Sequence, residues 1–136
     1  MLLYNSMVQK EDKDWRQTLT PEQFHVLREH GTERPGTSPL NSEKRAGMFA
    51  CAGCGQPLFS SDTKFESGTG WPSFFAPLEG AVDTTTDRSL FMTRIEVHCA
   101  KCGGHLGHVF PDGPRPTGQR YCMNGLALRF EPQPQP

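Results

Sequence analysis

Two thiols and two imidazoles lie close together in residues 99–108 of this chain. Cys99 and Cys102 are separated by two residues and followed by a glycine, which is the spacing of a zinc knuckle. His105 and His108 follow in a glycine-rich segment, which we interpret as a loop that lets both imidazoles point away from the metal. The thiols therefore predict a structural site, and the imidazoles predict chemistry.

A second C-x-x-C-G unit begins at Cys51 and repeats the spacing of the first. Four thiolates complete the tetrahedral shell of Zn²⁺, so we expect one structural zinc ion per chain. Its ligands would be Cys51, Cys54, Cys99 and Cys102. The alternatives are dithiol redox motifs or chance, but a redox C-x-x-C normally occurs once, at the start of a helix, and no helical pattern follows either unit. The chain has five cysteines, so one is left over.

The remaining cysteine, Cys122, lies in a segment, 120–130, that we interpret as extended chain. In such a strand Arg120, Cys122 and Asn124 share one face. Leu126, Leu128 and Phe130 would continue this face if Gly125 does not introduce a bulge. A lone cysteine is more often an inert buried residue than a nucleophile. Here the neighbouring cation favours the thiolate and the amide offers a fixed hydrogen-bond partner, so with the two imidazoles the cluster predicts a nucleophile with proton donors.

An aromatic cluster occupies residues 65–75, where glycines precede Trp71 and three phenylalanines supply apolar surface. Taken alone, the tryptophan is most simply a core residue. The segment 91–98 alternates apolar and polar residues, with Phe91, Ile95 and Val97 on one side. This pattern predicts a half-buried antiparallel strand that leads into the second knuckle, and a further strand is expected from Gly47 to Ala50, before the first knuckle.

The first regular element is expected to be a short amphipathic helix that starts after Thr20 and ends before Gly31. Thr20 and Gln23 have the spacing of a capping box, and Pro21 occupies the first helical position. Residues 32–46 are rich in turn formers and charge, so we expect an irregular surface segment there.

The 136 residues, 35% of them hydrophobic, are enough for one domain with a single core. A net charge of -1 without a cluster of lysine and arginine argues against binding to nucleic acid or to an anionic membrane. The first residues lack the features of a secretory signal, and no segment could span a bilayer. We therefore expect a cytoplasmic monomer.

Three phrases and the two knuckles together resemble the B-type methionine sulfoxide reductases, a family with a SelR-like domain. The phrases are Ser-Gly-Thr-Gly-Trp-Pro-Ser-Phe at 67–74, His-Leu-Gly-His-Val-Phe-Pro-Asp-Gly at 105–113 and Arg-Tyr-Cys-Met-Asn at 120–124. The resemblance covers residues 16–131. We expect a flexible segment at 1–15 and, because the chain ends in alternating proline and glutamine, a disordered tail at 132–136. It implies a mainly β fold of two facing antiparallel sheets with short N-terminal helices and a four-cysteine zinc site.

The resemblance also implies a function: reduction of the R epimer of methionine sulfoxide in oxidised proteins. Cys122 would be the nucleophile, with His105, His108, Asn124 and Arg120 as the other catalytic residues. Trp71, Phe74 and Phe110 would contact the substrate. Proton donation to the sulfoxide oxygen makes it a leaving group, and the attacking thiolate becomes a sulfenic acid.

Many members of this family have a second, resolving cysteine where this chain has Thr69. The departure implies that the sulfenic acid is reduced by an external thiol, either a thioredoxin-type protein or a small thiol. Two other classes are weighed against the enzyme. A ligand-binding module would not need Cys122 together with both imidazoles, and a zinc ribbon for nucleic acid conflicts with the charge balance.

Overall fold

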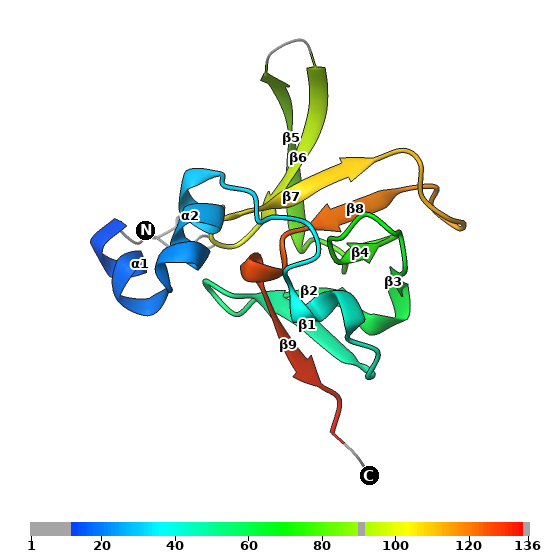
Figure 1. The fold of residues 1–136 in the computed structure, drawn as a ribbon, viewed down its shortest axis with the longest axis horizontal. Helices are drawn as coiled ribbons and strands as arrows, with labels where there is room; N and C mark the ends of the chain where they lie inside the picture. Colours follow the sequence, from blue (N-terminus) through cyan, green and yellow to red (C-terminus); the bar gives the residue numbers. More distant parts are fainter. Residues whose placement is uncertain (1–11, 90–91, 135–136) are drawn as a thin grey trace.

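The computed structural model describes residues 12–89 and 92–134, in which two short helices precede a set of antiparallel strands (Figure 1). The helices are α1 (Asp12–Thr18) and α2 (Pro21–Glu29). The strands are β1 (Gly47–Cys51), β2 (Pro57–Ser60), β3 (Lys64–Phe65), β4 (Ser73–Phe74), β5 (Val82–Ser89), β6 (Met92–Cys99), β7 (His105–Phe110), β8 (Arg120–Met123) and β9 (Leu128–Pro132). Short 3-10 turns cover Pro39–Ser42, Ser61–Thr63 and Gly125–Ala127.

The strands form two sheets, one with the order β2-β1-β9 and one with the order β3-β4-β8-β7-β6-β5. All the strand pairs are antiparallel. Aromatic rings join the sheets: Phe74 of β4 stacks on Phe59 of β2 with ring centroids 4.3 Å apart, and packs edge-on against Phe49 of β1. The predicted mainly β fold of two antiparallel sheets with short N-terminal helices is confirmed. No helix in these ranges has the length and apolarity that crossing a membrane requires.

Helix α2 begins as its sequence predicts. The Thr20 hydroxyl accepts a hydrogen bond from the backbone of Gln23, and the Gln23 side chain accepts one from the backbone of Thr20. Both bonds satisfy N–H groups that the first helical turn leaves without partners. The buried residues of α2 pack toward β7, which places the end of the helix beside the strand that carries the two imidazoles.

Ordered contacts are also made by residues just outside 16–131, the domain boundaries expected from the sequence. Helix α1 includes Trp15, whose side chain is buried beneath the guanidinium of Arg28 at 4.7 Å. At the other end, β9 runs to Pro132, and the backbone N–H of Gln133 donates to Ala46. Buried indole surface and strand pairing give these residues the contacts that composition alone did not reveal. Residues 1–11 and 135–136, the rest of the two expected terminal segments, lie outside the described ranges.

The expected continuous strand at 120–130 is wrong in one respect. Strand β8 ends at Met123, the chain makes the 3-10 turn Gly125–Ala127, and β9 continues in the other sheet. A Cβ atom at Gly125 would collide with the side chain of Ser38, so only glycine fits this crossing. Leu128 and Phe130 consequently do not continue the face that Cys122 occupies.

Strand β6 is present as predicted, but its expected buried side is covered only near the knuckle. Val97 is buried whereas Ile95 is exposed, because the β5–β6 hairpin projects beyond the body of the domain (Figure 1). Phe91, the first residue of the predicted pattern, lies outside the described ranges. The segment 32–46 is largely irregular, as expected, but it is not confined to the surface, since Glu33 is 6% exposed.

Candidate active site and metal centre

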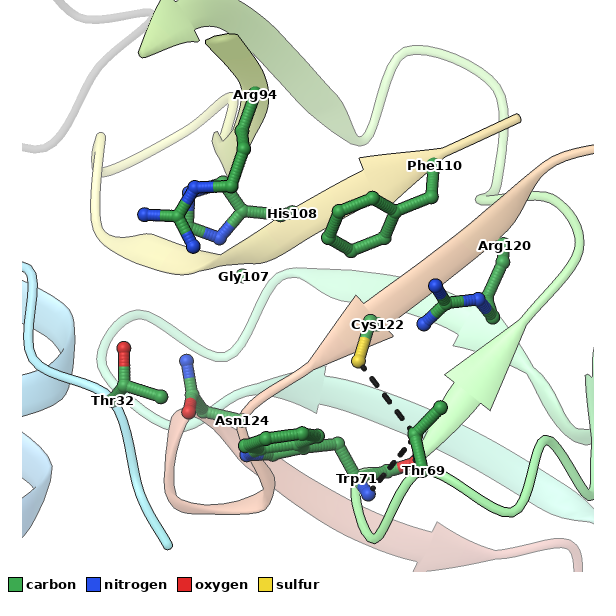
Figure 2. A pocket seen from close by; sticks show the side chains of 10 residues that line it. All are labelled: Thr32, Thr69, Trp71, Arg94, Gly107, His108, Phe110, Arg120, Cys122 and Asn124. Atoms are coloured by element: carbon green, nitrogen blue, oxygen red, sulfur yellow. Dashed lines mark hydrogen bonds between the residues drawn. The ribbon is translucent and has the colours of Figure 1, made fainter. Parts of the chain in front are cut away.

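A cavity of about 320 Å³ opens on the larger sheet and brings most of the predicted site residues together (Figure 2). It is lined by Thr32, Thr69, Trp71, Arg94, Gly107, His108, Phe110, Arg120, Cys122 and Asn124. This wall is formed by residues of β6, β7 and β8, together with residues of the loop between α2 and β1 and of the loop between β3 and β4. Arg120, Cys122 and Asn124 share the cavity, as the alternation of the sequence predicted.

The register of the sheet explains how the reactive side chains meet. Cys122 of β8 pairs with His108 of β7, and His108 pairs in turn with Glu96 of β6. Directly paired residues project from the same face of an antiparallel sheet. Cys122, His108 and Glu96 therefore form a row across three strands, and Arg120 and Phe110 form the start of a neighbouring row.

Cys122 is partly buried, and burial has the largest influence on its thiol, raising the pKa above the ordinary value of 9.0. Contacts with Thr69 and Arg120 act in the opposite direction but do not offset the burial. Arg120 thus favours the thiolate, as expected, but its effect on the pKa of Cys122 is smaller than the effect of burial. In the free protein the cavity holds a thiol.

Arg120 has two other partners that reduce its effect on the thiol. Its Nε donates to Oδ1 of Asp112 at 2.9 Å and its Nη2 to Oδ2 at 3.3 Å. The guanidinium also lies over the ring of Phe110, 4.5 Å from the centroid. The aspartate is a negative charge that itself raises the pKa of Cys122.

Asn124 and Trp71 are fixed by the backbone of Glu33. The Glu33 N–H donates to Oδ1 of Asn124 at 2.9 Å, and the Glu33 carbonyl accepts from Nε1 of Trp71 at 3.0 Å. The Asn124 amide nitrogen donates to the carbonyl of Leu106 at 3.1 Å. The Glu33 carboxylate accepts from the N–H of Leu126, which anchors this backbone against the Gly125–Ala127 turn. The amide thus has one orientation, with an N–H left for a ligand in the cavity.

The two imidazoles lie on strand β7 and not on the loop that the glycines suggested. Gly103 has a φ of +76° and completes the knuckle turn, after which pairing with β6 and β8 extends the chain from His105. His108 lines the cavity, and its Nε2 lies 3.2 Å from Oδ2 of Asp87. His105 is 2% exposed and does not line the cavity, although its ring centroid is 5.5 Å from that of His108.

Phe74 is placed differently from the expectation that it contacts the substrate. Its ring is fully buried between the sheets against Phe59 and Phe49, and it is absent from the cavity wall. The neighbouring Ser73 pairs with Cys122, so side chains alternate and Phe74 takes the opposite side of β4. Phe110 and Trp71 supply the aromatic surface of the cavity instead.

A chain of hydroxyl groups approaches Cys122 from the loop before β4. Oγ1 of Thr69 lies 3.9 Å from Sγ of Cys122 and 2.8 Å from Oγ of Ser67, and Ser67 contacts Ser73 at 2.7 Å. Ser73 donates to the carbonyl of Trp71. Thr69, at the position where the resemblance implies a resolving cysteine in many family members, therefore places a hydroxyl in contact with the sulfur of Cys122.

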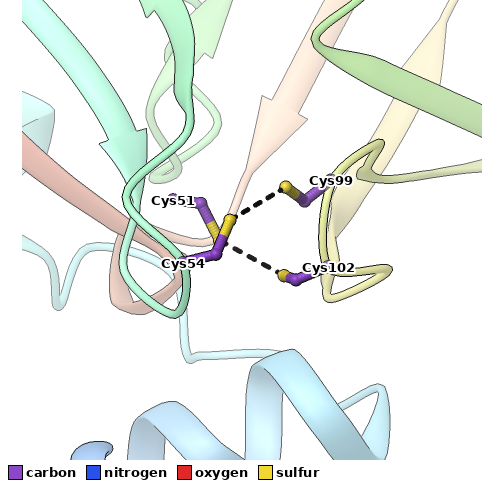
Figure 3. Close-up of side chains that lie close together, drawn as sticks. All are labelled: Cys51, Cys54, Cys99 and Cys102. Carbon is purple, nitrogen blue, oxygen red and sulfur yellow. Dashed lines mark hydrogen bonds between the residues drawn. The ribbon is translucent and has the colours of Figure 1, made fainter. Parts of the chain in front are cut away.

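The four knuckle cysteines form a second cluster (Figure 3), and none of them lines the cavity. Their Sγ atoms all lie within 4.8 Å of one another, with Cys51 and Cys102 at 3.7 Å and Cys54 and Cys99 at 3.5 Å. Tetrahedral zinc with Zn–S bonds of about 2.3 Å requires sulfur atoms roughly 3.8 Å apart, so the donor set fits Zn²⁺. Hydrogen bonds within the cluster lower the pKa of Cys54 and Cys99 and raise the pKa of Cys51 and Cys102, so two of the thiols ionise readily and zinc binding would displace the protons of the other two.

Several polar residues of the site were not identified from the sequence. They are Thr32, Glu33, Asp87, Arg94, Glu96 and Asp112. Only Glu96 had a local signal, since it lies on the polar side of the alternating segment 91–98. The others act through partners that are distant in the sequence or across a turn, and no local pattern marks such contacts.

These features define a class of small two-sheet β domains in which a four-thiol metal centre lies apart from a cavity with one free cysteine. The family model described as the SelR domain matches residues 19–132, and the chain belongs to this family. The resemblance recognised in the sequence is thereby confirmed.

Curated relatives agree with this assignment. A protein of Agrobacterium fabrum is 58% identical over 131 residues, which cover 96% of this chain and 97% of the relative, and one of Methanosarcina mazei is 59% identical over 124 residues, covering 90% and 89%. Both are named peptide methionine sulfoxide reductase MsrB. Among solved structures, the crystal structure of the Mis18 'Yippee-like' domain matches with a TM-score of 0.54 and 19% identity, over 67% of this chain and all of that domain. That likeness concerns the fold.

Proposed function

We propose that this protein is a peptide-methionine (R)-S-oxide reductase that repairs oxidised proteins. The observation that carries the proposal is the direct pairing of Cys122 with His108 in a cavity that also contains an indole ring, a phenyl ring and a fixed amide. These groups match what the reduction of a methyl sulfoxide requires. The names of the relatives support the same reaction.

The reaction joins a nucleophile and an acid on one substrate group. The sulfur of Cys122 attacks the electrophilic sulfur of the sulfoxide while the sulfoxide oxygen is protonated. The S–S bond formed in this attack and the S–O bond of the substrate then break as the hydroxyl group passes to Cys122, which becomes a sulfenic acid. The substrate leaves as methionine, so the cysteine is oxidised and the methionine sulfur is reduced. No proton is consumed overall, because the thiol supplies the hydrogen that the sulfenic acid retains.

Because Cys122 is protonated in the free protein, the imidazoles must both remove the thiol proton and donate a proton to the sulfoxide oxygen. Because burial keeps this sulfur as a thiol, a base must remove its proton before attack. His108 is the imidazole in the cavity wall, directly opposite the thiol in the sheet. It can take this proton and donate it to the sulfoxide oxygen, with His105 as the second imidazole of the site.

Selectivity for the R epimer follows from the unequal sides of the cavity. Trp71 and Phe110 offer apolar contacts for the methyl group, with Trp71 fixed by its hydrogen bond to Glu33. Asn124 and His108 offer hydrogen bonds for the oxygen. Exchange of the oxygen and the lone pair would place the oxygen away from these donors.

The proposal includes a structural Zn²⁺ bound by the four knuckle cysteines, whose role is to join the two knuckles and stabilise the fold. It also includes an external reductant, either a thioredoxin-type protein or a small thiol, because Cys122 is the only cysteine of the five outside the metal cluster. Five reduced cysteines suit the cytoplasm, where we place the enzyme, as a monomer.

A peptide that carries both sulfoxide epimers of one methionine tests the function directly. With excess dithiothreitol, the protein should consume the R epimer and leave the S epimer, as resolved by chromatography of the products. The matched control is Cys122→Ser, which should consume neither. Equal consumption of both epimers would refute the stereochemical assignment, and full zinc content without any turnover would indicate a binding module.

A further inference from the structure

One carboxylate oxygen joins two imidazoles beside the cavity. Oε2 of Glu96 lies 2.6 Å from Nδ1 of His105 and 3.2 Å from Nε2 of His30. The side chains become progressively more exposed, from 2% for His105 through 12% for Glu96 to 66% for His30. The arrangement therefore leads from the interior of the site to solvent.

The three residues come from separate elements that converge. Glu96 belongs to β6 and His105 to β7, whereas His30 follows the last turn of α2. His30 has a φ of 58°, a left-handed conformation that is uncommon for a residue with a side chain. In this position it ends the helix and places its ring near the glutamate, with its centroid 5.3 Å from that of His105.

The location of the proton on His105 follows from this contact. A carboxylate can only accept, so the short bond to Glu96 requires the hydrogen to reside on Nδ1. Burial lowers the pKa of His105 below its ordinary 6.5, which makes the ring neutral at neutral pH despite the opposing effect of Glu96. The other nitrogen, Nε2, is then unprotonated, and it is buried without a hydrogen-bond partner among the described residues.

We propose that Glu96 is a positioning residue that acts through His105: it fixes the hydrogen of this imidazole on Nδ1 and thereby keeps Nε2 as a proton acceptor. The inference rests on the proposed reductase function, in which His108 is the base for the thiol of Cys122 and His105 is the second imidazole. Because its ring centroid is 5.5 Å from that of His108, His105 can hold the proton that His108 takes from the thiol and return it for the sulfoxide oxygen, and Glu96 stabilises the imidazolium that forms in between. His30 supports the carboxylate from the solvent side.

The charged and titratable groups that face His105 are few and come from three elements. They are Glu96, His108 and His30, of which only Glu96 raises the pKa of His105. Replacement of this carboxylate by an amide preserves its shape but removes its preference for a donor. In a serine protease triad the equivalent change keeps the geometry and stabilises the wrong tautomer.

Nitrogen NMR of the ¹⁵N-histidine-labelled, zinc-loaded protein measures the tautomer without any substrate. The wild type should show His105 protonated at Nδ1 and unprotonated at Nε2. In Glu96→Gln the Nε2-protonated form should become populated, whereas Glu96→Asp should retain the wild-type form. A wild-type His105 that is protonated at Nε2 would overturn the proposal, and this result does not depend on how well the variants fold.

Kinetics then tests the consequence for the reaction. In a single turnover, Glu96→Gln should form the sulfenic acid at least about tenfold more slowly with little change in KM, and Glu96→Asp should recover part of the rate. The matched control is Glu29→Gln, which removes an exposed carboxylate 3.2 Å from His25 and should leave tautomer and rate unchanged. A wild-type rate in zinc-loaded Glu96→Gln with an altered tautomer would refute the positioning role of Glu96. A wild type with the expected tautomer and no turnover would instead refute the reductase function.

Discussion

The backbone N–H of Glu33 and the side chain of Asn124, 91 residues apart, are joined by a 2.9 Å hydrogen bond to Oδ1. This bond orients the amide nitrogen of Asn124, which donates to the carbonyl of Leu106 and is available as a donor on the cavity wall. The hydrogen bond thereby joins the segment after α2 to the residue that follows β8.

Asn124→Asp should test this orientation. A carboxylate would still accept from Glu33, but its second oxygen would approach the carbonyl of Leu106 and would offer the substrate no N–H. We expect a loss of stability of about 1–3 kcal/mol and a decrease in kcat/KM of at least about tenfold. Urea unfolding and steady-state kinetics measure the two effects.

Asn41→Asp is the matched control for that variant. The amide nitrogen of Asn41 also donates to a backbone carbonyl, that of Gly70, at 2.9 Å, but Asn41 lies outside the cavity wall. It should lose stability and retain kcat. An Asn124→Asp protein with wild-type kcat/KM would show that the substrate oxygen does not need this donor.

Local patterns in the sequence predicted the parts of the fold whose causes are local. The capping box at Thr20 and the shared face of Arg120, Cys122 and Asn124 each depend on a few neighbouring residues, and the structure shows both. The two knuckles also identified each other, because their spacing repeats.

The remaining features depend on residues that meet only in the folded chain. The side of β4 that Phe74 occupies is set by the pairing of Ser73 with Cys122, 49 positions further along the chain, and the sequence does not contain that register. The loop predicted around His105 became a strand for the same reason, since β6 and β8 supply its hydrogen bonds. Glu33 was missed because no local motif marks its contacts with Asn124 and Trp71.

The metal centre gives a second prediction. Cys51→Ser and Cys102→Ser should lose zinc and leave the domain largely unfolded, because the ion joins two knuckles and a structural site contributes folding free energy. Circular dichroism and metal analysis measure both properties. A chelator strong enough to remove the zinc should unfold the wild type in the same way. Folded, active and metal-free variants would contradict the assignment of a structural zinc ion.

Cys122→Ser is the comparison that separates the metal centre from the cavity. It should retain zinc and circular dichroism like the wild type, because Cys122 lies outside the four-thiol cluster. Its turnover should fall to the limit of detection, since serine is a far weaker nucleophile toward sulfur. Near-normal turnover in this variant would end the proposed mechanism.

The pH dependence of Cys122 reactivity is a third prediction. Because burial raises its pKa above 9.0, alkylation of the free enzyme by iodoacetamide should accelerate with pH and reach half its limit above 9.0. The sign for stability follows: above 9.0 the unfolded chain loses this proton first, so rising pH reduces the free energy of unfolding until the folded thiol also ionises.

Arg120→Gln should shift the alkylation midpoint further upward, because the guanidinium lowers the pKa of Cys122. Arg129→Gln, which changes an exposed arginine paired with Glu131, is the control and should leave the midpoint unchanged. Mass spectrometry of the peptide that contains Cys122 separates its alkylation from that of the zinc ligands. A midpoint well below 9.0 would mean that the free enzyme already holds the thiolate.

The last prediction concerns Thr69, whose hydroxyl lies 3.9 Å from the sulfur of Cys122. With the other four cysteines in the metal cluster, the sulfenic acid formed in one turnover has no free thiol partner among the native cysteines. After one turnover without reductant, dimedone should label Cys122, and the intact mass should show one added oxygen and not the loss of two hydrogens that marks a disulfide.

Thr69→Cys should convert this outcome into the other, because a thiol at the position of the hydroxyl would lie next to the sulfenic acid and condense with it. Dimedone labelling should then fall, and a disulfide between residues 69 and 122 should appear in the peptide map. Thr69→Ser, which retains a hydroxyl without adding a thiol, is the control and should label like the wild type. In the wild type, a disulfide between Cys122 and a knuckle cysteine, with stoichiometric release of zinc, would show that the metal centre itself supplies the resolving thiol.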